Sequence, residues 1–382
     1  MSGAGIPGAG APGAGTPGPA ASACDACVRR TWLLGRLAGH LERARARAGD
    51  LLALDDAALI AAIGGPHAAA IGDERTEAQP AGERARCAAL GVELVCRCSA
   101  AYPQPLRKLP APPAVLHALG NVARRHELLS GPAVAVVGSR RPSPSGVAVA
   151  EALARDLSAA GVTVVSGLAS GIDSAAHAGA LEAGGRTVAV LAAGPDRPPA
   201  ASRGLHARVL HAGLVVSELA PGASARRWMF PARNRIIAGL AAMTVVVQGR
   251  AGSGALLTAG VAAELGRPVG AVPGDIGSSL SVGPHRLLRG GATLVDGCEP
   301  VLDEVLGDAA LDPRPGSARP GPPAPREPRA AALLQAIADG HEVPAAIRRA
   351  GLELNAGLAA LAALELEGRL RRGPGGRYIS LP

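Results

Sequence analysis

Short apolar runs alternate with longer Ala/Leu-rich stretches through the middle of the chain. The first run, Ala133–Val137, ends at Gly138 and is followed by a helical pattern over residues 146–160. Apolar runs of this length suit strands buried on both faces, and their alternation with helices predicts right-handed βαβ units. Further strands are expected at 162–166, 187–191, 214–217, 244–248, 269–272 and 292–295, and further helices at 174–183, 203–212, 233–241 and 256–265.

This alternation predicts an α/β fold, an extended Rossmann-like, doubly wound and mostly parallel sheet over residues 106–308. The ligand of such a sheet lies beyond the carboxyl ends of its strands. Before the sheet, the spacing of apolar residues predicts a small helical module over residues 23–105, like a SAM or helix-hairpin-helix module. Its helices are expected at 31–47 and 51–63, and the Gly/Ala/Pro-rich residues 1–22 are expected to be a disordered tail.

A third unit is expected after a Pro-rich linker over residues 309–329. Helical patterns cover 333–338, 343–350 and 355–367. The strand-like segments 370–372 and 378–381 then flank a Gly/Pro turn. Three helices followed by a hairpin predict a winged helix over residues 330–382, a module that binds DNA in some proteins and protein partners in others.

Charge changes this picture little. The chain carries 39 basic and 31 acidic side chains, a net charge of +8, and Lys108 is its only lysine. The excess is spread almost evenly, so charge alone marks no segment as a nucleic-acid-binding domain. The planar guanidinium of arginine can donate two hydrogen bonds to one phosphate. The chain has only two Trp, two Tyr and one Phe, which are too few for a row of aromatic side chains that stack on bases.

Membrane association is not expected. The longest uncharged apolar stretch near the middle of the chain is residues 236–247, and a spanning helix needs about 20 residues. The N-terminal segment has neither a basic start nor a continuous apolar core, so it does not resemble a secretory signal. A cytoplasmic protein is the expectation.

Cysteines leave three interpretations open. Cys24 and Cys27 form a C-x-x-C pair, and Cys96 and Cys98 a C-x-C pair, so together they could supply four thiolates to zinc. The pairs are separated by 68 residues, and C-x-C is a poor half of a standard zinc knuckle. Reduced thiols without a metal are therefore expected, with zinc as the first alternative and a disulfide framework as the second.

Glycine- and serine-rich turns follow four of the expected strands. Such turns, opening into helices, present backbone N–H groups to an anion. They begin at Gly138, Ser166, Phe230 and Gly252. Neither G-x-G-x-x-G nor G-x-x-x-x-G-K-[ST] occurs, which argues against a dinucleotide fingerprint and a P-loop. Each turn is a weak signal alone, but four that converge at one sheet edge predict an anion-binding site.

Five segments, four of which contain these turns, resemble in order and spacing the motifs of the DNA-processing protein A family (DprA, also called Smf). They read VAVVGSRRPSPSG, VVSGLASGIDSAAHAGAL, FPARNRIIAGL, SGALLTA and AVPGDIGSSLSVGPHRLLRGGA. The resemblance covers about residues 100–306. It implies a single-stranded DNA-binding protein that protects incoming DNA and loads a RecA-type recombinase on it during natural transformation. It also implies a homodimer formed through the Rossmann-like domain, without catalytic activity or a cofactor.

The resemblance carries a DNA site over to this chain residue by residue. The expected DNA-binding positions are Gly138, Ser139, Arg140, Ser166, Gly167, Gly171, Asp173, Asn234, Arg235, Ser253, Gly254 and Thr258. Backbone amides and arginines would hold phosphate there, and small residues would let the strand approach.

This sequence departs from the family pattern at three places. Ser170 stands where a basic residue is common, Gln248 stands where an acidic residue is common, and residues 194–201 lack a usual Tyr-Pro pair. Losing one phosphate contact predicts weaker or displaced DNA binding, which Arg141 or Arg203 could offset.

Two other functions remain in view. Phosphoribohydrolases of the same Rossmann-like superfamily carry P-G-G-x-G-T-x-x-E, but residues 250–258 here have no glutamate at the expected place. A regulatory or scaffolding role, with the winged helix binding a partner, is compatible with DNA binding. Release of free base from a nucleotide would favour the enzyme.

Overall fold

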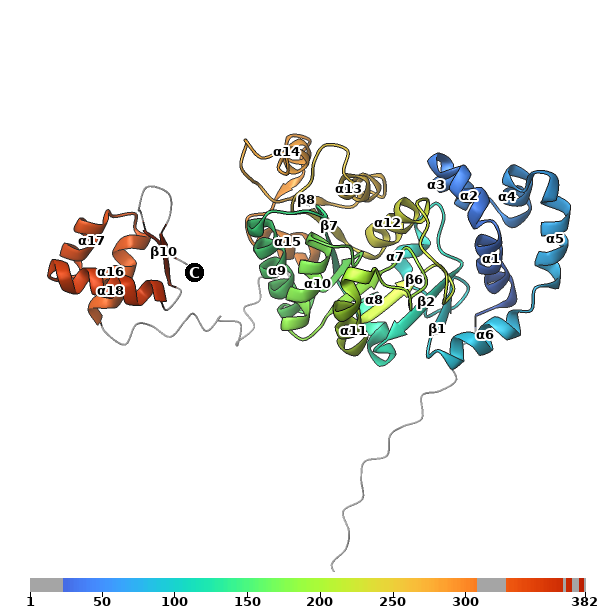
Figure 1. The fold of residues 1–382 in the computed structure, drawn as a ribbon, viewed down its shortest axis with the longest axis horizontal. Coiled ribbons are helices and arrows are strands. Elements are labelled where there is room, and N and C mark those ends of the chain that lie inside the picture. Colours follow the sequence, from blue (N-terminus) through green and yellow to red (C-terminus); the bar gives the residue numbers. More distant parts are fainter. Residues whose placement is uncertain (1–22, 308–327, 367–368, 373–377, 381–382) are drawn as a thin grey trace, which may run out of the picture. The chain divides into compact units, whose positions relative to one another are not determined.

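The structure, a computed structural model, describes residues 23–307, 328–366, 369–372 and 378–380. The chain divides between residues 310 and 311 into two compact units. The first unit contains the large sheet and a group of N-terminal helices (Figure 1), and the second contains a smaller set of helices and strands. The predicted tail over 1–22 and nearly all of the predicted linker lie outside the described residues.

The first unit is built on a nine-stranded sheet in the order β1-β2-β6-β5-β4-β3-β7-β8-β9. From β6 to β9 all neighbours are parallel, while β2 pairs antiparallel with both β1 and β6. The chain runs from β3 outward to β6 and then returns to the other side of β3 as β7, so the strand order reverses between β3 and β7. The strands are β1 (Glu93–Cys96), β2 (Val115–Gly120), β3 (Ala133–Val137), β4 (Thr163–Ser166), β5 (Thr187–Val190), β6 (Leu214–Ser217), β7 (Met243–Val246), β8 (Val269–Ala271) and β9 (Thr293–Leu294).

Helices cover both faces of this sheet, which confirms the doubly wound, mostly parallel α/β architecture. Alternate residues of β3 enter different cores: Ala135 packs with α7, α8, α12 and α13, and Val136 packs with α9, α10 and α15. Beside the second core, α11 covers β5 and β6. The helices are α7 (Gln104–Arg107), α8 (Arg125–Ser130), α9 (Pro144–Ala159), α10 (Ile172–Glu182), α11 (Arg203–Ala212), α12 (Met229–Leu240), α13 (Gly254–Glu264), α14 (Val282–Arg289) and α15 (Glu299–Leu306).

Six short helices form the helical region, which lies beside the edge of the sheet that β1 and β2 form (Figure 1). They are α1 (Asp25–Arg36), α2 (Ala38–Arg43), α3 (Ala48–Ala53), α4 (Asp56–Ile63), α5 (Ala68–Glu77) and α6 (Pro80–Ala89). Their core continues onto the start of α12, where Trp228 and Met229 are buried with it. The Trp228 backbone N–H also donates to the Glu42 carboxylate at 3.2 Å. The helical region therefore supports the end of α12 from which the candidate site is built.

The helical region corrects three expectations. Residues 31–47 are not one helix, because α1 begins at Asp25 and the chain breaks at Leu37, between Gly35 and Gly39. Residues 51–63 are divided between α3 and α4, because Asp55 accepts the Ala58 N–H at 2.8 Å and so starts a new helix. The all-helical interpretation of this segment is also wrong at β1, whose antiparallel partner β2 follows a Pro-rich connector over residues 102–113.

The second unit contains the three helices and two strands that its sequence predicts. They are α16 (Pro328–Ala338), α17 (Val343–Arg349), α18 (Leu354–Leu366), β10 (Leu370–Arg372) and β11 (Tyr378–Ser380). The two strands pair antiparallel, and Leu333, Ile347 and Leu361 are fully or almost fully buried between the helices. The predicted turn of the hairpin lies outside the described residues.

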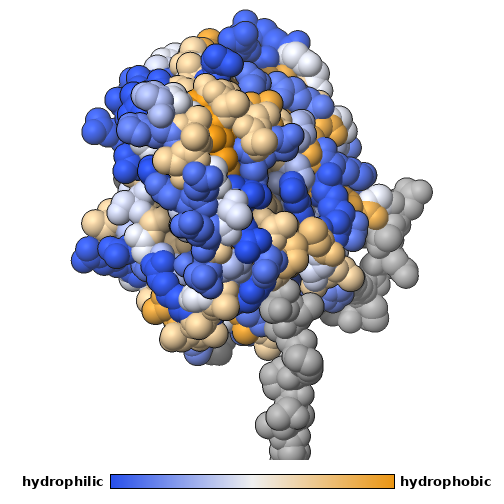
Figure 2. All heavy atoms as spheres, turned by 90° about the vertical axis from the view of Figure 1, so that its right-hand side faces the viewer, coloured by the Kyte–Doolittle hydropathy of each residue, from blue (hydrophilic) through white to orange (hydrophobic). Residues whose placement is uncertain are grey.

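The surface of the helical region is mostly hydrophilic. Figure 2 looks onto this side of the molecule and shows small apolar patches separated by polar side chains. Among the described helices, none combines the length and apolar character that crossing a bilayer requires.

Candidate nucleic-acid interface

A cleft of about 440 Å³ opens at the carboxyl ends of β3 and β7, where the strand order reverses. This position is the one at which doubly wound sheets bind ligands. We call it the strand-end cleft; it is lined by residues 137–140 and 250–255, by Asp173, and by Phe230, Arg233 and Asn234 of α12. A side pocket of about 380 Å³ shares Arg140, Ala169, Phe230 and Arg233 with the cleft and is also lined by Gly167, Ser170 and Arg197.

Arg233 is the buried cation of both pockets. Its residue is 7% exposed, and its Nε has no hydrogen-bond partner. Across the described residues, its guanidinium makes no hydrogen bond and no ion pair within 4 Å. Burial lowers the pKa of Arg233, an effect that the charge of Asp173 opposes and the charge of Arg140 increases. A buried arginine without a partner carries a desolvation cost that an anion in the cleft would offset.

The turn between β4 and α10 holds Asp173 and Gly167 against this arginine. Asp173 is 7% exposed and accepts the Gly167 N–H at 3.2 Å. Burial raises the pKa of Asp173, and Arg233 together with the N–H groups of Ala169 and Gly167 opposes that rise. Leu168 in the same turn has φ of 53°, a left-handed conformation that a non-glycine residue adopts only when its surroundings enforce it. The turn is therefore fixed by its packing.

Arg140 supplies an exposed positive charge at the mouth of the cleft. It follows β3, and its guanidinium carbon lies 5.1 Å from the centroid of the Phe230 ring. This cation–π contact orients the guanidinium and covers one part of the ring that a base could otherwise stack on. Gly138 and Ser139 lie beside it and line the cleft with the end of β3.

The loop after β7 forms the opposite wall. Ser253 lies at the N-cap of α13, and its buried Oγ has no hydrogen-bond partner. The Gly254 carbonyl accepts from Asn234 Nδ2 at 3.4 Å and from Thr258 Oγ1 at 3.3 Å. The first turn of α13 therefore faces the cleft with the N–H groups that a helix start leaves unpaired.

The twelve predicted DNA-binding positions are not all brought to one place. Those that line the strand-end cleft are Gly138, Ser139, Arg140, Asp173, Asn234, Ser253, Gly254 and Thr258. Gly167 lines the side pocket, and Ser166, Gly171 and Arg235 line neither. Ser166 is buried and donates to the Val136 carbonyl at 2.7 Å. Gly171 has φ of 88°, and an ideal Cβ on it would lie 2.3 Å from the Ser139 carbonyl oxygen. These two positions shape the turns.

Arg235 points away from the cleft. Its Nη2 lies 2.7 Å and 2.8 Å from the two carboxylate oxygens of Glu218, and both side chains are 11% exposed. Arg233 and Arg235 are two residues apart on α12, about 200° around the helix axis at 3.6 residues per turn. The structure thus places Arg233 in the cleft and makes Arg235 part of a buried ion pair.

Arg233 lines both pockets but is not among the twelve positions expected from the sequence. Helical periodicity offered a signal, because two arginines two residues apart cannot face the same strand ends. Arg250 was missed as well: it is exposed, follows β7 and lines the cleft. Arg141 and Arg203, considered as substitutes for a basic residue at Ser170, line neither pocket, whereas Arg197 lines the side pocket.

Gln248, a departure from the family pattern, acts within the fold. Its Oε1 accepts the Ser143 backbone N–H at 3.0 Å, and its Nε2 donates to Ser143 Oγ at 2.8 Å. An ideal Cβ on Gly146 would lie 2.4 Å from Gln248 Oε1, so the amide fills the space above this glycine. Gln248 therefore holds the start of α9 against the end of β7.

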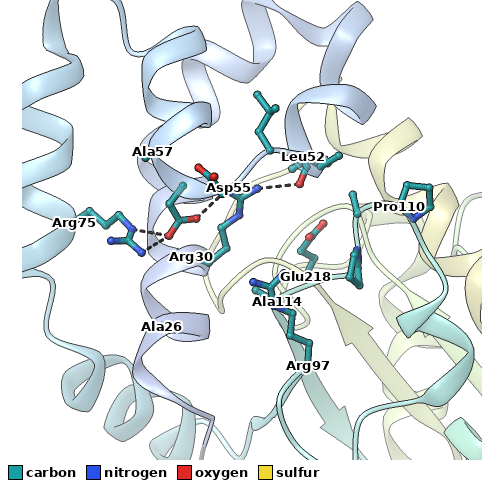
Figure 3. Close-up of a pocket in the computed structure, with 15 residues that line it drawn as sticks. Ala26, Arg30, Leu52, Asp55, Ala57, Arg75, Arg97, Pro110, Ala114 and Glu218 are labelled. Atoms are coloured by element: carbon teal, nitrogen blue, oxygen red, sulfur yellow. Dashed lines mark hydrogen bonds and ion pairs between the residues drawn. The ribbon is translucent and has the colours of Figure 1, made fainter.

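A larger pocket of about 560 Å³ lies between the helical region and the sheet (Figure 3). Two of its arginines are already paired, because Arg30 and Arg75 both form ion pairs with Asp56. Glu218, the partner of Arg235, also lines it. Its charges largely satisfy one another, so we place the anion site at the smaller strand-end cleft.

Gly167→Ala tests the close approach of Arg233 to the β4–α10 turn. An ideal Cβ on Gly167 would lie 1.4 Å from Arg233 Nη1, so the substitution must displace the guanidinium. Losing charge-assisted hydrogen bonds to a ligand phosphate costs about 1.5–3 kcal/mol, or roughly 10- to 100-fold in Kd. Fluorescence anisotropy with an oligothymidylate measures the loss.

Gly260→Ala is the matched control, because nothing lies within 4 Å of its ideal Cβ on α13. We expect it to bind the oligonucleotide as the unsubstituted chain does. Equal affinity of Gly167→Ala and Gly260→Ala would show that the position of Arg233 does not matter.

Comparison with known proteins now decides the family. The sequence profile described as DNA recombination-mediator protein A matches residues 93–306, more than half of the chain. The chain belongs to the DNA recombination-mediator protein A family. This confirms the resemblance seen in the sequence motifs, and the match includes every element that contributes a residue to the strand-end cleft.

Relatives of this family extend the comparison. The chain is 46% identical over 210 residues to a Mycobacterium tuberculosis relative and spans about half of that protein's length. The X-ray structure of DNA processing protein A from Streptococcus pneumoniae shares 32% identity with a TM-score of 0.60, over 74% of this chain and 99% of that one. DNA processing protein A from Helicobacter pylori, described for its single-stranded DNA binding mode, shares 25% identity with a TM-score of 0.50, over 57% and 96% of the two chains.

Proposed function

We propose that this protein binds single-stranded DNA in the strand-end cleft and loads a RecA-type recombinase on it during natural transformation. The observation that carries the proposal is Arg233, a buried guanidinium without a partner among the described residues, at the switch point of the sheet. The family relationship and the DNA-binding Helicobacter pylori relative support it.

Phosphate is the group that the cleft suits. Arg140, Arg233 and Arg250 line it, and Asp173 is the acidic side chain among its described lining residues. Guanidinium forks and the N–H groups at the start of α13 both favour an anion. Phe230 is the aromatic residue of this lining, and Arg140 already lies over its ring. Binding would therefore depend on the backbone of the DNA, with little base stacking.

Partners complete the proposed role. We assign the recombinase, a homodimer through the Rossmann-like domain, and a cytoplasmic site of action to the protein as part of the same proposal. Exposed apolar side chains in the part of the sheet unit that follows α13 fit a protein contact: Ile276, Val282 and Leu294. The helices and strands of the second unit fit a winged helix over residues 330–382, and the proposed boundaries of the other domains are 23–105 and 106–308.

Arg140→Ala tests the electrostatic part of the proposal. Because Arg140 is exposed at the cleft mouth, its loss should weaken binding only moderately. Each lost phosphate contact lowers the slope of log K against log salt by about 0.7 for single-stranded DNA. Titrations of an oligothymidylate at several salt concentrations measure both quantities.

Arg208→Ala serves as the matched control, since Arg208 is an exposed arginine on α11 and lines neither pocket. It should leave the salt slope unchanged. A slope that falls equally in both variants would indicate a diffuse effect of net charge and would count against a phosphate contact at Arg140.

A further inference from the structure

Four cysteines that are far apart in sequence converge beside the edge of the sheet. Cys24 is the N-cap of α1 and Cys27 lies in the first turn of that helix. Cys96 ends β1, and Cys98 lies in the turn that follows. We call these four residues the cysteine cluster; none of them lines the strand-end cleft or the side pocket.

Three of the four sulfur positions suit a tetrahedral metal site. The Sγ atoms of Cys24, Cys27 and Cys98 all lie within 4.8 Å of one another, and Cys27 Sγ is 3.7 Å from Cys98 Sγ. The thiol of Cys96 is near enough to that of Cys24 to interact with it. Zinc–sulfur bonds of about 2.3 Å in a tetrahedron place the sulfurs about 3.8 Å apart.

The surrounding structure holds both pairs in place. Cys27 and Cys96 are buried in a small core with Ala23, Val28 and Val115. The guanidinium of Arg107 donates to the carbonyls of Arg97 and Ser99, each at 2.6 Å, and so fixes the turn that carries Cys98. The Ser99 backbone N–H donates to the Cys96 carbonyl at 2.9 Å. The C-x-C pair is therefore a rigid turn at the end of a strand.

We propose that Cys24, Cys27, Cys96 and Cys98 bind one zinc ion as a closed, four-thiolate structural site. Binding replaces four S–H bonds by four zinc–sulfur bonds and releases the thiol protons to solvent. The ion joins the first helix of the helical region to β1, the edge strand of the sheet. This departs from the sequence expectation of metal-free thiols, because the 68-residue interval that argued against a site is closed by the fold.

A disulfide is the competing outcome. Cys27 Sγ and Cys98 Sγ lie 3.7 Å apart, but a disulfide bond between them would use only two of the four thiols and would require an oxidant. A zinc ion would bind all four sulfurs as thiolates without changing their oxidation state. The two outcomes differ in metal content and in the mass of the unreduced protein.

The test measures zinc in the full chain, purified without a metal-affinity tag, by inductively coupled plasma mass spectrometry. We expect about one zinc per chain, as in other structural four-cysteine sites. Cys98→Ala should lose the metal, and because Cys98 is exposed the variant should still fold. Cys98→His should retain it, since imidazole nitrogen is also a zinc ligand. The Cys298→Ala control, outside the cluster, should keep the zinc of the unsubstituted chain.

Cobalt substitution provides the second readout. The cobalt form should show thiolate-to-cobalt charge transfer and the visible bands of tetrahedral coordination, and a chelator should lower the Tm of the unsubstituted chain but not of Cys98→Ala. Absence of zinc after incubation of the reduced protein with zinc salt would overturn the proposal. So would equal zinc in Cys98→Ala, or a Cys27–Cys98 disulfide in metal-free protein isolated without reductant.

Discussion

Arg233→Met is expected to remove most of the affinity for single-stranded DNA while the chain remains folded. Truncating one side of a buried charge contact costs about 2–5 kcal/mol, which is roughly thirtyfold or more in Kd. Stability should change by less than about 1 kcal/mol, because methionine replaces a buried guanidinium that has no ion-pair partner in the described chain. Asp173 keeps its hydrogen bond from Gly167.

Two measurements check this result on the same preparation. Fluorescence anisotropy with an oligothymidylate gives Kd, and thermal unfolding gives the stability change. Unchanged affinity in a folded Arg233→Met variant would show that the strand-end cleft is not the DNA-binding site. A large loss of stability would mean that Arg233 has a structural partner.

Arg235→Met is expected to behave in the opposite way. The substitution leaves the Glu218 carboxylate buried without its cation, and breaking a buried ion pair costs about 3–5 kcal/mol. Because Arg235 points away from the cleft, the fraction that folds should bind DNA as tightly as the unsubstituted chain. The two variants form a matched pair, with the same substitution two residues apart on one helix.

Chemical denaturation at low temperature, followed by DNA titration under conditions where the variant is folded, separates the two effects. A folded Arg235→Met variant that had lost DNA binding would show that this side chain leaves its ion pair to contact the ligand. Glu218→Gln should also lower stability, because it leaves the Arg235 charge without a carboxylate.

The parallel part of the sheet could be predicted from local sequence because its strands are short apolar runs bounded by glycine. Ala133–Val137 and Leu214–Ser217 begin and end where the pattern places them. β1 and β2 could not be predicted in this way. Glu93–Cys96 is a short strand at the sheet edge, and its pairing with Val115–Gly120 depends on a contact across the Pro-rich connector. Local periodicity carries no information about such a partner.

The site was predictable in position but not in detail. The turns at Gly138 and Ser253 were expected to converge because the carboxyl ends of parallel strands share one edge, and both line the cleft. The distinction between Arg233 and Arg235 depends on how α12 is rotated, which its packing against the sheet and the helical region determines. The spacing of Cys27 and Cys96 in the sequence likewise did not predict that they lie close together. The helices between them bring β1 back beside the start of α1, and this return depends on tertiary packing.

A crystal structure of the full chain with an oligothymidylate tests the central claim most directly. The account predicts a phosphate oxygen about 2.9 Å from a guanidinium nitrogen of Arg233, with the DNA backbone passing Arg140 and the start of α13. Arg235 should remain paired with Glu218. DNA bound elsewhere, with Arg233 facing an empty strand-end cleft, would contradict it.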